Sequence, residues 1–178
     1  MQTVLYWFGK ILVMLIQALP VGLVARVGRL GGGLAYYLDA RHRRVAIDGL
    51  TKAFPEKSAE EIRRIAHENF RRIGESGGCG IKVASMAPEK VLARCEIIGL
   101  EKLAGPVAGG NRIFAVGHFG SFEVLAFAGA SVPGYRTATT FRGIASPALN
   151  RLMQEVRNQT GALFFERRSG VKQLMGAL

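Results

Sequence analysis

A histidine and a glutamate five residues apart are the side chains of this sequence that are best suited to chemistry. His118 and Glu123 lie in the stretch RIFAVGHFGSFEV. The spacing is poor for a shared helix face, because helical neighbours lie three or four residues apart. The two side chains can converge if His118 ends a strand and Glu123 lies in the first turn of the next helix. They would then stand at the carboxyl end of a strand, where α/β sheets place their chemistry.

The pair predicts general-base catalysis. A neutral imidazole backed by a carboxylate can take the proton of a substrate hydroxyl while that oxygen attacks a carbonyl carbon. No protein nucleophile is evident, because Phe119 stands where a nucleophile elbow around Ser121 would need its first glycine. One His and one Glu are too few for a zinc site, so no metal is expected. A structural role for His118 beside an apolar strand is the alternative interpretation.

The elements that would position the pair alternate between strand and helix patterns after Pro88. Ser146 and Pro147 are typical of the N-cap and first position of a helix. This alternation predicts an α/β fold, a mixed sheet flanked by helices. We expect strands over 95–98, 113–117, 135–141 and 162–165, and helices over 88–94, about 121–130, from 147 to before Gly161, and from 169.

The N-terminal segment is the most hydrophobic part of the chain. Its apolar run is interrupted by Lys10, Gln17 and Pro20, and it falls short of the ~20 apolar residues that span a bilayer. We expect a membrane-inserting helix over 1–30, kinked at Pro20, that either just spans the bilayer or lies in one leaflet. A buried core helix of a soluble domain is the alternative.

The region between this helix and Pro88 carries clear helix signals. Pro55 ends a first helical stretch, and Ser58 with Glu61 forms a capping box that begins an amphipathic helix. We expect this helix to end at Gly74, since glycine often terminates helices. The glycines at 77, 78 and 80 then indicate a loose connection.

The charge balance favours a polyanionic partner. The chain has 24 Lys and Arg against 13 Asp and Glu, a formal net charge of +11. Nucleic acid, an anionic lipid surface and an acidic protein all fit this excess. The basic cluster at 41–44 follows the N-terminal helix, so if that helix is a membrane element, we expect the remaining chain on the cytoplasmic side. A solvated basic helix face is the alternative interpretation of this cluster. A nucleic-acid-binding domain is the weakest of these alternatives, because no helix-turn-helix or aromatic-basic signature is present.

The stretch HFGSFE resembles the H-x4-[D/E] motif of the glycerolipid and lysophospholipid acyltransferases. Its flanks, RRVAIDGLTKAFPEKSAEEIRRI and FRGIASPALNRLMQEVRNQTGALFFERRSGVKQLMGAL, are similar to those of the bacterial lipid A biosynthesis (lauroyl/myristoyl) acyltransferases. Asp48-Gly49 replaces the family's Asn before Leu50. The resemblance covers nearly the whole chain but only the first part of a usual family member, so we expect a chain truncated at its C-terminus.

The resemblance implies a glycerolipid-acyltransferase-like fold, with an acyltransferase domain over 31–178 on the cytoplasmic side of the inner membrane. The activity would be transfer of a fatty acyl group from acyl carrier protein or coenzyme A to a lipid hydroxyl. The acceptor would be a lipid A precursor or related glycolipid, no cofactor is implied, and no nucleic acid would be bound. A lysophospholipid acyltransferase and a non-catalytic, membrane-anchored remnant of such an enzyme are the alternatives.

The resemblance also assigns roles to individual residues. His118 would be the base and Glu123 the carboxylate that orients it. Arg142 matches the arginine of the segment after the motif and would hold a phosphate group or stabilise oxyanion charge. The other residues that we expect to bind substrate are Ser121, Arg167 and Arg168.

Overall fold

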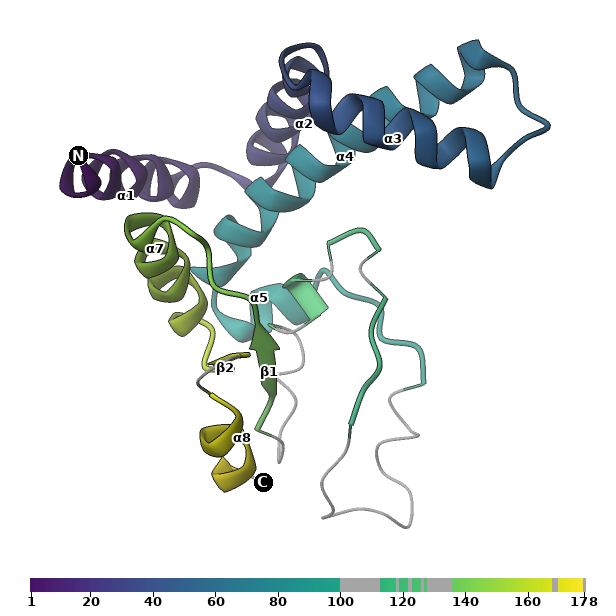
Figure 1. Cartoon of the computed structure of the whole chain (residues 1–178). Helices are drawn as coiled ribbons and strands as arrows, with labels where there is room; N and C mark the ends of the chain where they lie inside the picture. The colour runs from purple at the N-terminus through teal and green to yellow at the C-terminus, as the bar shows by residue number, and fades with distance from the viewer. Residues whose placement is uncertain are drawn as a thin grey trace. The chain divides into compact units, whose positions relative to one another are not determined.

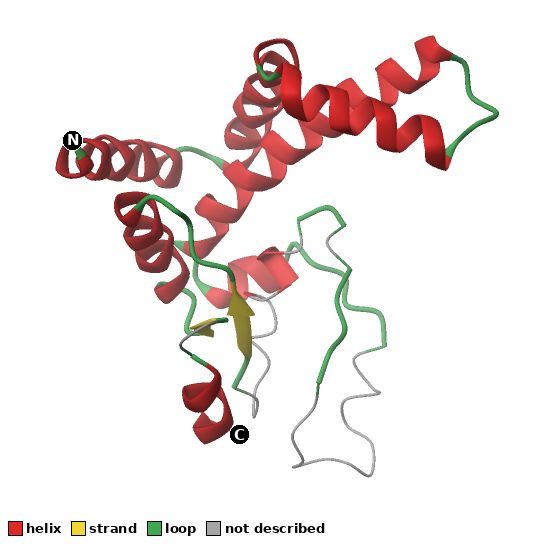
Figure 2. Cartoon of the chain, viewed as in Figure 1, coloured by secondary structure: helices red, strands yellow, loops and turns green. Residues whose placement is uncertain are grey.

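The computed structural model describes residues 1–99, 113–117, 119–121, 123–125, 127, 136–167 and 170–177. Two compact units make up the chain. Unit 1 comprises Met1–Met14 and Val83–Leu178, and unit 2 comprises Leu15–Lys82. Helices dominate the described residues, and strands occur only near the C-terminal end of the described chain (Figures 1 and 2).

The N-terminal region forms two helices rather than one. Helix α1 spans Gln2–Ala18 and α2 spans Val21–Leu38. Pro20, at the predicted kink, is the residue that precedes α2 and has an extended conformation, with φ −61° and ψ 142°. Of the helices in the described part of the chain, none is both long enough and apolar enough to cross a membrane.

Local capping signals set the next two helices. Helix α3 (Ala40–Ala53) begins after Asp39, whose carboxylate accepts a 3.0 Å hydrogen bond from the amide of His42. Helix α4 (Ala59–Ala84) begins after the predicted capping box. There the Ser58 amide and hydroxyl each donate to Glu61 Oε2 at 2.9 Å, and the Glu61 amide donates back to Ser58 Oγ at 3.2 Å. The capping-box prediction is therefore confirmed.

The predicted end of this helix at Gly74 is wrong. Helix α4 continues to Ala84 through all the glycines that suggested a loose connection. A Cβ on Gly28 of α2 would lie 2.5 Å from the carbonyl oxygen of Gly74, and one on Gly32 would collide with the carbonyl of Phe70. Glycine lets the backbones of α2 and α4 approach this closely. The resulting packing compensates for the poor helix propensity of the glycines in α4.

Polar and aromatic contacts surround this glycine crossing within unit 2. Arg29 of α2 donates from Nη2 to Glu68 Oε1 at 2.7 Å and from Nη1 to Glu75 Oε2 at 3.0 Å. The buried ring of Tyr36 lies 5.0 Å from the His67 ring and 5.5 Å from the Phe70 ring, centre to centre. These contacts join α2 to α4 within unit 2.

Unit 1 contains a strand-helix-strand motif. Strand β1 (Ala138–Phe141) and strand β2 (Leu163–Glu166) pair in parallel, with Ala138 opposite Leu163 and Phe141 opposite Glu166. Helix α7 (Pro147–Asn158) connects them, and Figure 1 shows it beside the two strands. Short helices α5 (Pro88–Leu92) and α8 (Val171–Ala177) complete the described elements.

The start of α7 confirms its predicted capping. Ser146 is the N-cap residue, and its hydroxyl accepts from the Leu149 amide at 3.5 Å, with Pro147 in the first turn. The helix buries Ala148, Leu152 and Val156. The predicted helix from 147 to before Gly161 is therefore confirmed.

Two of the four expected strands are wrong. Residues 95–98 and 113–117 form no strand, and Ile113 is 96% exposed where a buried strand was expected. A strand needs a partner for its backbone hydrogen bonds, and no described residue pairs with either segment. The described part of the fold is thus mostly helical, with a two-stranded parallel sheet in place of a larger mixed one.

Candidate functional site

Glu123 is the first described residue of a helical segment. This agrees with the prediction that it lies in the first turn of a helix. Residues 123–125 and 127 are helical, and the Val124 amide donates to the Ser121 carbonyl at 2.9 Å. The Glu123 carboxylate accepts a hydrogen bond at Oε1 from Arg157 Nη2, at 2.7 Å. Among the described residues, no partner is found for Oε2 of this carboxylate. One oxygen is thus fixed by a cation, and the other can bind a further donor.

Arg157 is held firmly in the last turn of α7. Its side chain is 14% exposed, against 29% for Glu123. The guanidinium carbon lies 5.1 Å from the ring centre of Phe141 on β1 and 5.3 Å from that of Phe164 on β2. Stacking on the two aromatic rings already restricts the guanidinium group, so its ion pair with the carboxylate costs little further side-chain entropy. Arg157 therefore connects both strands to the Glu123 carboxylate.

The other half of the predicted pair lies outside the described residues. His118 is not described, so the expected contact between His118 and Glu123 stays a prediction. Arg168, expected to bind substrate, lies outside them as well. Ser121 is exposed and lies two residues before Glu123.

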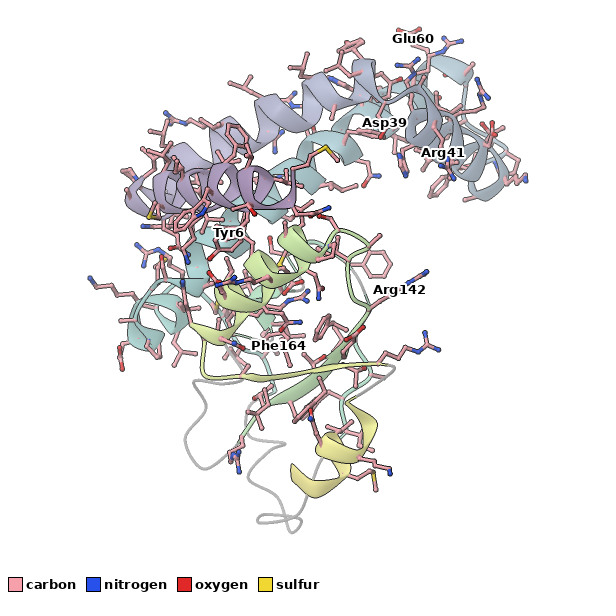
Figure 3. The ribbon with its side chains drawn as sticks, turned by 60° about the vertical axis from the view of Figure 1, so that its left-hand side comes forward. Tyr6, Asp39, Arg41, Glu60, Arg142 and Phe164 are labelled. Carbon is pink, nitrogen blue, oxygen red and sulfur yellow. The ribbon has the colours of Figure 1, made fainter. Side chains whose placement is uncertain are left out.

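Arg142 and Arg167 lie on neighbouring backbone segments, at the carboxyl ends of the two paired strands. Arg142 follows the last residue of β1, and Arg167 follows the last residue of β2. The Arg167 amide donates to the Phe141 carbonyl at 2.8 Å, which holds the two segments side by side. Both side chains are exposed, and Figure 3 shows Arg142 extending away from the ribbon. Two exposed guanidinium groups at one sheet edge can bind phosphate or carboxylate groups.

The loop after β1 is tied to α7 and to β2. The Ile144 amide donates to Asn150 Oδ1 at 3.0 Å. A Cβ on Gly143 would lie 2.8 Å from Glu166 Oε1, so only glycine fits there without displacing that carboxylate. These contacts fix the path of the chain directly after Arg142. Within the described ranges, no group of three His, Cys, Asp or Glu side chains could hold a metal ion.

Arg157 is a candidate functional residue that the sequence analysis does not predict. Its partner is 34 positions away in the sequence, so no local spacing rule relates the two residues. The available signal is its place next to Val156, which belongs to the buried face of α7. A charged residue bordering an apolar helix face is a weak indication of a buried ion pair, because most such residues are solvated.

Comparisons with known proteins agree on one family. The family model described as bacterial lipid A biosynthesis acyltransferase matches residues 1–178. The chain is 28% identical over 151 residues to the lipid A biosynthesis myristoyltransferase of Escherichia coli K12, covering 84% of this chain and 45% of that protein. It is 33% identical over 125 residues to the lauroyltransferase of the same organism, covering 67% of this chain and 40% of that protein.

A third relative matches a longer stretch. Lipid A biosynthesis acyltransferase 2 of Shigella flexneri is 28% identical over 176 residues, which is 94% of this chain and 54% of that protein. The chain therefore spans about half the length of the curated relatives that it matches. No solved structure matches the chain.

Proposed function

The chain belongs to the family of bacterial lipid A biosynthesis acyltransferases, and on that premise we propose that it transfers a fatty acyl group to a lipid A precursor. The acyl donor is a thioester of acyl carrier protein or coenzyme A, and the acceptor is a hydroxyl group of the lipid. The family match over the whole chain, which includes the motif from His118 to Glu123, is the observation that carries this proposal.

His118 acts as the general base in the proposed reaction. It takes the proton of the acceptor hydroxyl while that oxygen attacks the thioester carbonyl carbon. The tetrahedral intermediate then collapses, the carbon–sulfur bond breaks, and the leaving thiolate takes the proton from the imidazolium. The products are the acylated lipid and the free thiol of the carrier. The residue pattern and the resemblance support this role for His118.

Glu123 orients His118 in this proposal, and Arg157 orients Glu123. The Arg157 hydrogen bond engages Oε1 of the carboxylate, so Oε2 is the oxygen that we expect to accept from the imidazole. A carboxylate behind a catalytic imidazole fixes its tautomer and stabilises the imidazolium that forms. The packed guanidinium of Arg157 would keep the carboxylate from rotating away.

Arg142 and Arg167 supply positive charge at the carboxyl end of the sheet. We expect Arg142 to hold a phosphate group of the acceptor or donor, or to stabilise the developing oxyanion. Arg167, Arg168 and Ser121 would assist in substrate binding. The exposure of Arg142, Arg167 and Ser121 is compatible with these roles.

The proposed site of action is the cytoplasmic face of the inner membrane. The formal net charge of +11 suits anionic phospholipid and an acidic carrier protein. The family match supports action at a membrane, because the acceptor that the family's name implies is a lipid.

Acyl transfer in membranes from cells that express the chain tests the proposal. The assay supplies labelled acyl carrier protein thioester and endogenous lipid, and compares the wild type with His118→Ala. We expect a labelled lipid product that disappears in this variant and survives in His42→Ala, since the side chain of His42 is exposed on α3. Transfer that survives His118→Ala would refute the mechanism. Absence of product in the wild type, with the chain present and folded, would favour the non-catalytic alternative.

A further inference from the structure

A single carboxylate on α7, that of Glu155, binds side chains of two helices within unit 1. The Tyr6 hydroxyl lies 2.8 Å and 3.0 Å from its two oxygens, and Lys10 Nζ lies 2.5 Å from Oε2. Arg151, one turn earlier on α7, donates from Nε to Oε1 at 3.1 Å, and its guanidinium carbon lies 4.6 Å from the centre of the Tyr6 ring. In Figure 3, Tyr6 lies on the side of α1 that faces α7. We call these four residues the Glu155 network.

The contact between α1 and α7 also includes the start of α7. Gln2 Oε1 accepts hydrogen bonds from Ser146 Oγ at 3.1 Å and from the Ala148 amide at 3.3 Å. The helices also touch through apolar groups, since a Cβ on Gly9 would lie 2.7 Å from Leu152 Cδ2. Helix α1 therefore contacts α7 from its N-cap to its last turn.

The Glu155 network is partly shielded from water. The exposed fraction is 31% for the Lys10 side chain and 29% for the Glu155 side chain. Salt screens a partly buried ion pair less than an exposed one. Because Tyr6 and Lys10 lie one turn apart on α1 and bind the same carboxylate, the network restricts both the position and the rotation of α7 relative to α1.

The other side of α7 carries the contact with the candidate site. Glu155 and Arg157 are two residues apart, so their side chains leave α7 on roughly opposite sides. Arg157 donates to Glu123 Oε1 at 2.7 Å and stacks on Phe141 and Phe164. The last turn of α7 therefore joins α1 on one side to the Glu123 carboxylate on the other.

We propose that Glu155 is a positioning residue for acyl transfer, which holds α7 against α1 so that Arg157 keeps the Glu123 carboxylate aligned with the catalytic base. The proposal deepens the proposed function, on which it rests for its kinetic readout. Apolar contacts are non-directional, so without the Glu155 network they leave the rotation of α7 less defined. A displacement of about 1 Å away from the chemistry can lower a rate about a hundredfold. Helix α1 is then part of the framework that sets the catalytic geometry.

Steady-state acyl transfer by the full chain tests the role of the network. Glu155→Gln and Lys10→Met should each lower kcat by about tenfold, less than the loss for a full 1 Å displacement, and should leave KM nearly unchanged. The pH profile of kcat should move as well, because the alignment of the carboxylate affects the base. Glu96→Gln is the matched control, at an exposed carboxylate of unit 1 outside the described helices and strands, and it should keep wild-type kinetics. A kcat and a pH profile equal to those of the wild type in both network variants would overturn the proposal.

A double-mutant cycle tests whether Glu155 acts through Arg157. Residues that act as one unit have non-additive effects, so Glu155→Gln should cause little further loss of kcat in an Arg157→Gln background. Losses that multiply in the double variant would show that Glu155 acts independently of Arg157 and would overturn the proposal. Circular dichroism checks that each variant folds. Tyr6→Phe, which removes one hydroxyl and keeps the ring that Arg151 contacts, serves as the milder network variant.

Hydrogen–deuterium exchange gives a readout that does not depend on acyl transfer. The Val124 amide, which donates to the Ser121 carbonyl at 2.9 Å, lies next to Glu123 and should report the coupling. Lys10→Met should raise exchange several-fold in the peptide that contains Val124 as well as in α7, whereas Glu96→Gln should not. Faster exchange in α7 alone would overturn the coupling.

The two readouts separate this proposal from the proposed function. Faster exchange at Val124 in Lys10→Met, in a chain whose wild type transfers no acyl group, would support the coupling and refute the proposed function. Active acyl transfer with unchanged kcat and unchanged exchange in the network variants would do the reverse.

Discussion

The Arg157 side chain reaches across 34 positions of the sequence to hold Glu123 at 2.7 Å. This contact links the last turn of α7 to the helix that follows the histidine motif. Because α7 packs through Leu152 and Val156, the position of the Glu123 carboxylate depends on the core of unit 1. The contact therefore joins Glu123 to the packed part of unit 1.

Arg157→Gln should lower the kcat of acyl transfer by about a hundredfold or more, as expected when an acid–base pair loses its alignment. Arg157→Lys should restore little of this loss, because an ammonium group lacks the planar guanidinium that stacks on Phe141 and Phe164. Steady-state kinetics with labelled thioester measure both variants.

The matched control for this substitution is Arg136→Gln, at an exposed arginine before β1. It should retain wild-type kinetics. A positioning role also requires that the pH profile of kcat moves in Arg157→Gln while thermal unfolding shows a folded protein. Unchanged kcat and an unchanged pH profile in this variant would contradict the role.

Arg142→Gln should raise the KM for the phosphate-bearing substrate more than it lowers kcat. A hydrogen bond to a charged group contributes about 1.5–3 kcal/mol, equivalent to roughly a tenfold to hundredfold change in affinity. Arg142→Lys should recover part of the loss, since the charge remains. A KM equal to that of the wild type would show that Arg142 is only a surface residue at the end of β1.

Gly32→Ala should destabilise the protein by about 1–3 kcal/mol, the usual cost of forcing an extra methyl group into a tight contact. The new Cβ would collide with the carbonyl of Phe70. Gly31→Ala, one residue away on α2, meets no atom within 4 Å. It should stabilise the helix by up to about 1 kcal/mol through alanine's higher helix propensity. Urea unfolding of the two variants should give changes of opposite sign.

The ion pair at Glu155 should make stability depend on acid pH. The Lys10 ammonium, with the Tyr6 hydroxyl, lowers the pKa of the Glu155 carboxyl from 4.5 to about 2. Since the folded-state pKa is the lower one, the contribution to stability is complete above pH 4.5 and is lost as the pH falls toward 2. The difference in unfolding free energy between wild type and Glu155→Gln should shrink over this range. A difference that stays constant with pH would contradict the assignment.

Local sequence signals predicted the helices well. The capping box at Ser58 and the N-cap at Ser146 each depend on a few neighbouring residues, and each lies where the sequence placed it. At Pro20, where a kink within one helix was expected, the structure has a break between two helices. Strands β1 and β2 also fall within or beside their expected ranges, 135–141 and 162–165. Short-range hydrogen bonding and apolar periodicity therefore account for most of the described secondary structure.

Features that depend on distant residues were not predictable in this way. The glycines after Gly74 look like a loop until the glycines of α2 are placed against α4. Residues 113–117 have strand-like composition, but strand formation depends on a partner rather than on composition. The contact between Arg157 and Glu123 likewise arises only from the tertiary structure. For the candidate site, the sequence predicts residue types, whereas their partners depend on the tertiary structure.

Main chain meets main chain where α2 and α4 cross at Gly28, Gly32 and Gly74. No side chain is immobilised at these closest points, so folding loses no rotamer freedom there. Each glycine nevertheless gives up more backbone freedom than alanine would, at about 0.5–1 kcal/mol per residue. The glycine-rich half of α4 therefore becomes stable as a helix only once α2 is in place. The two segments should fold and unfold as one cooperative unit, so that melting either one releases the other.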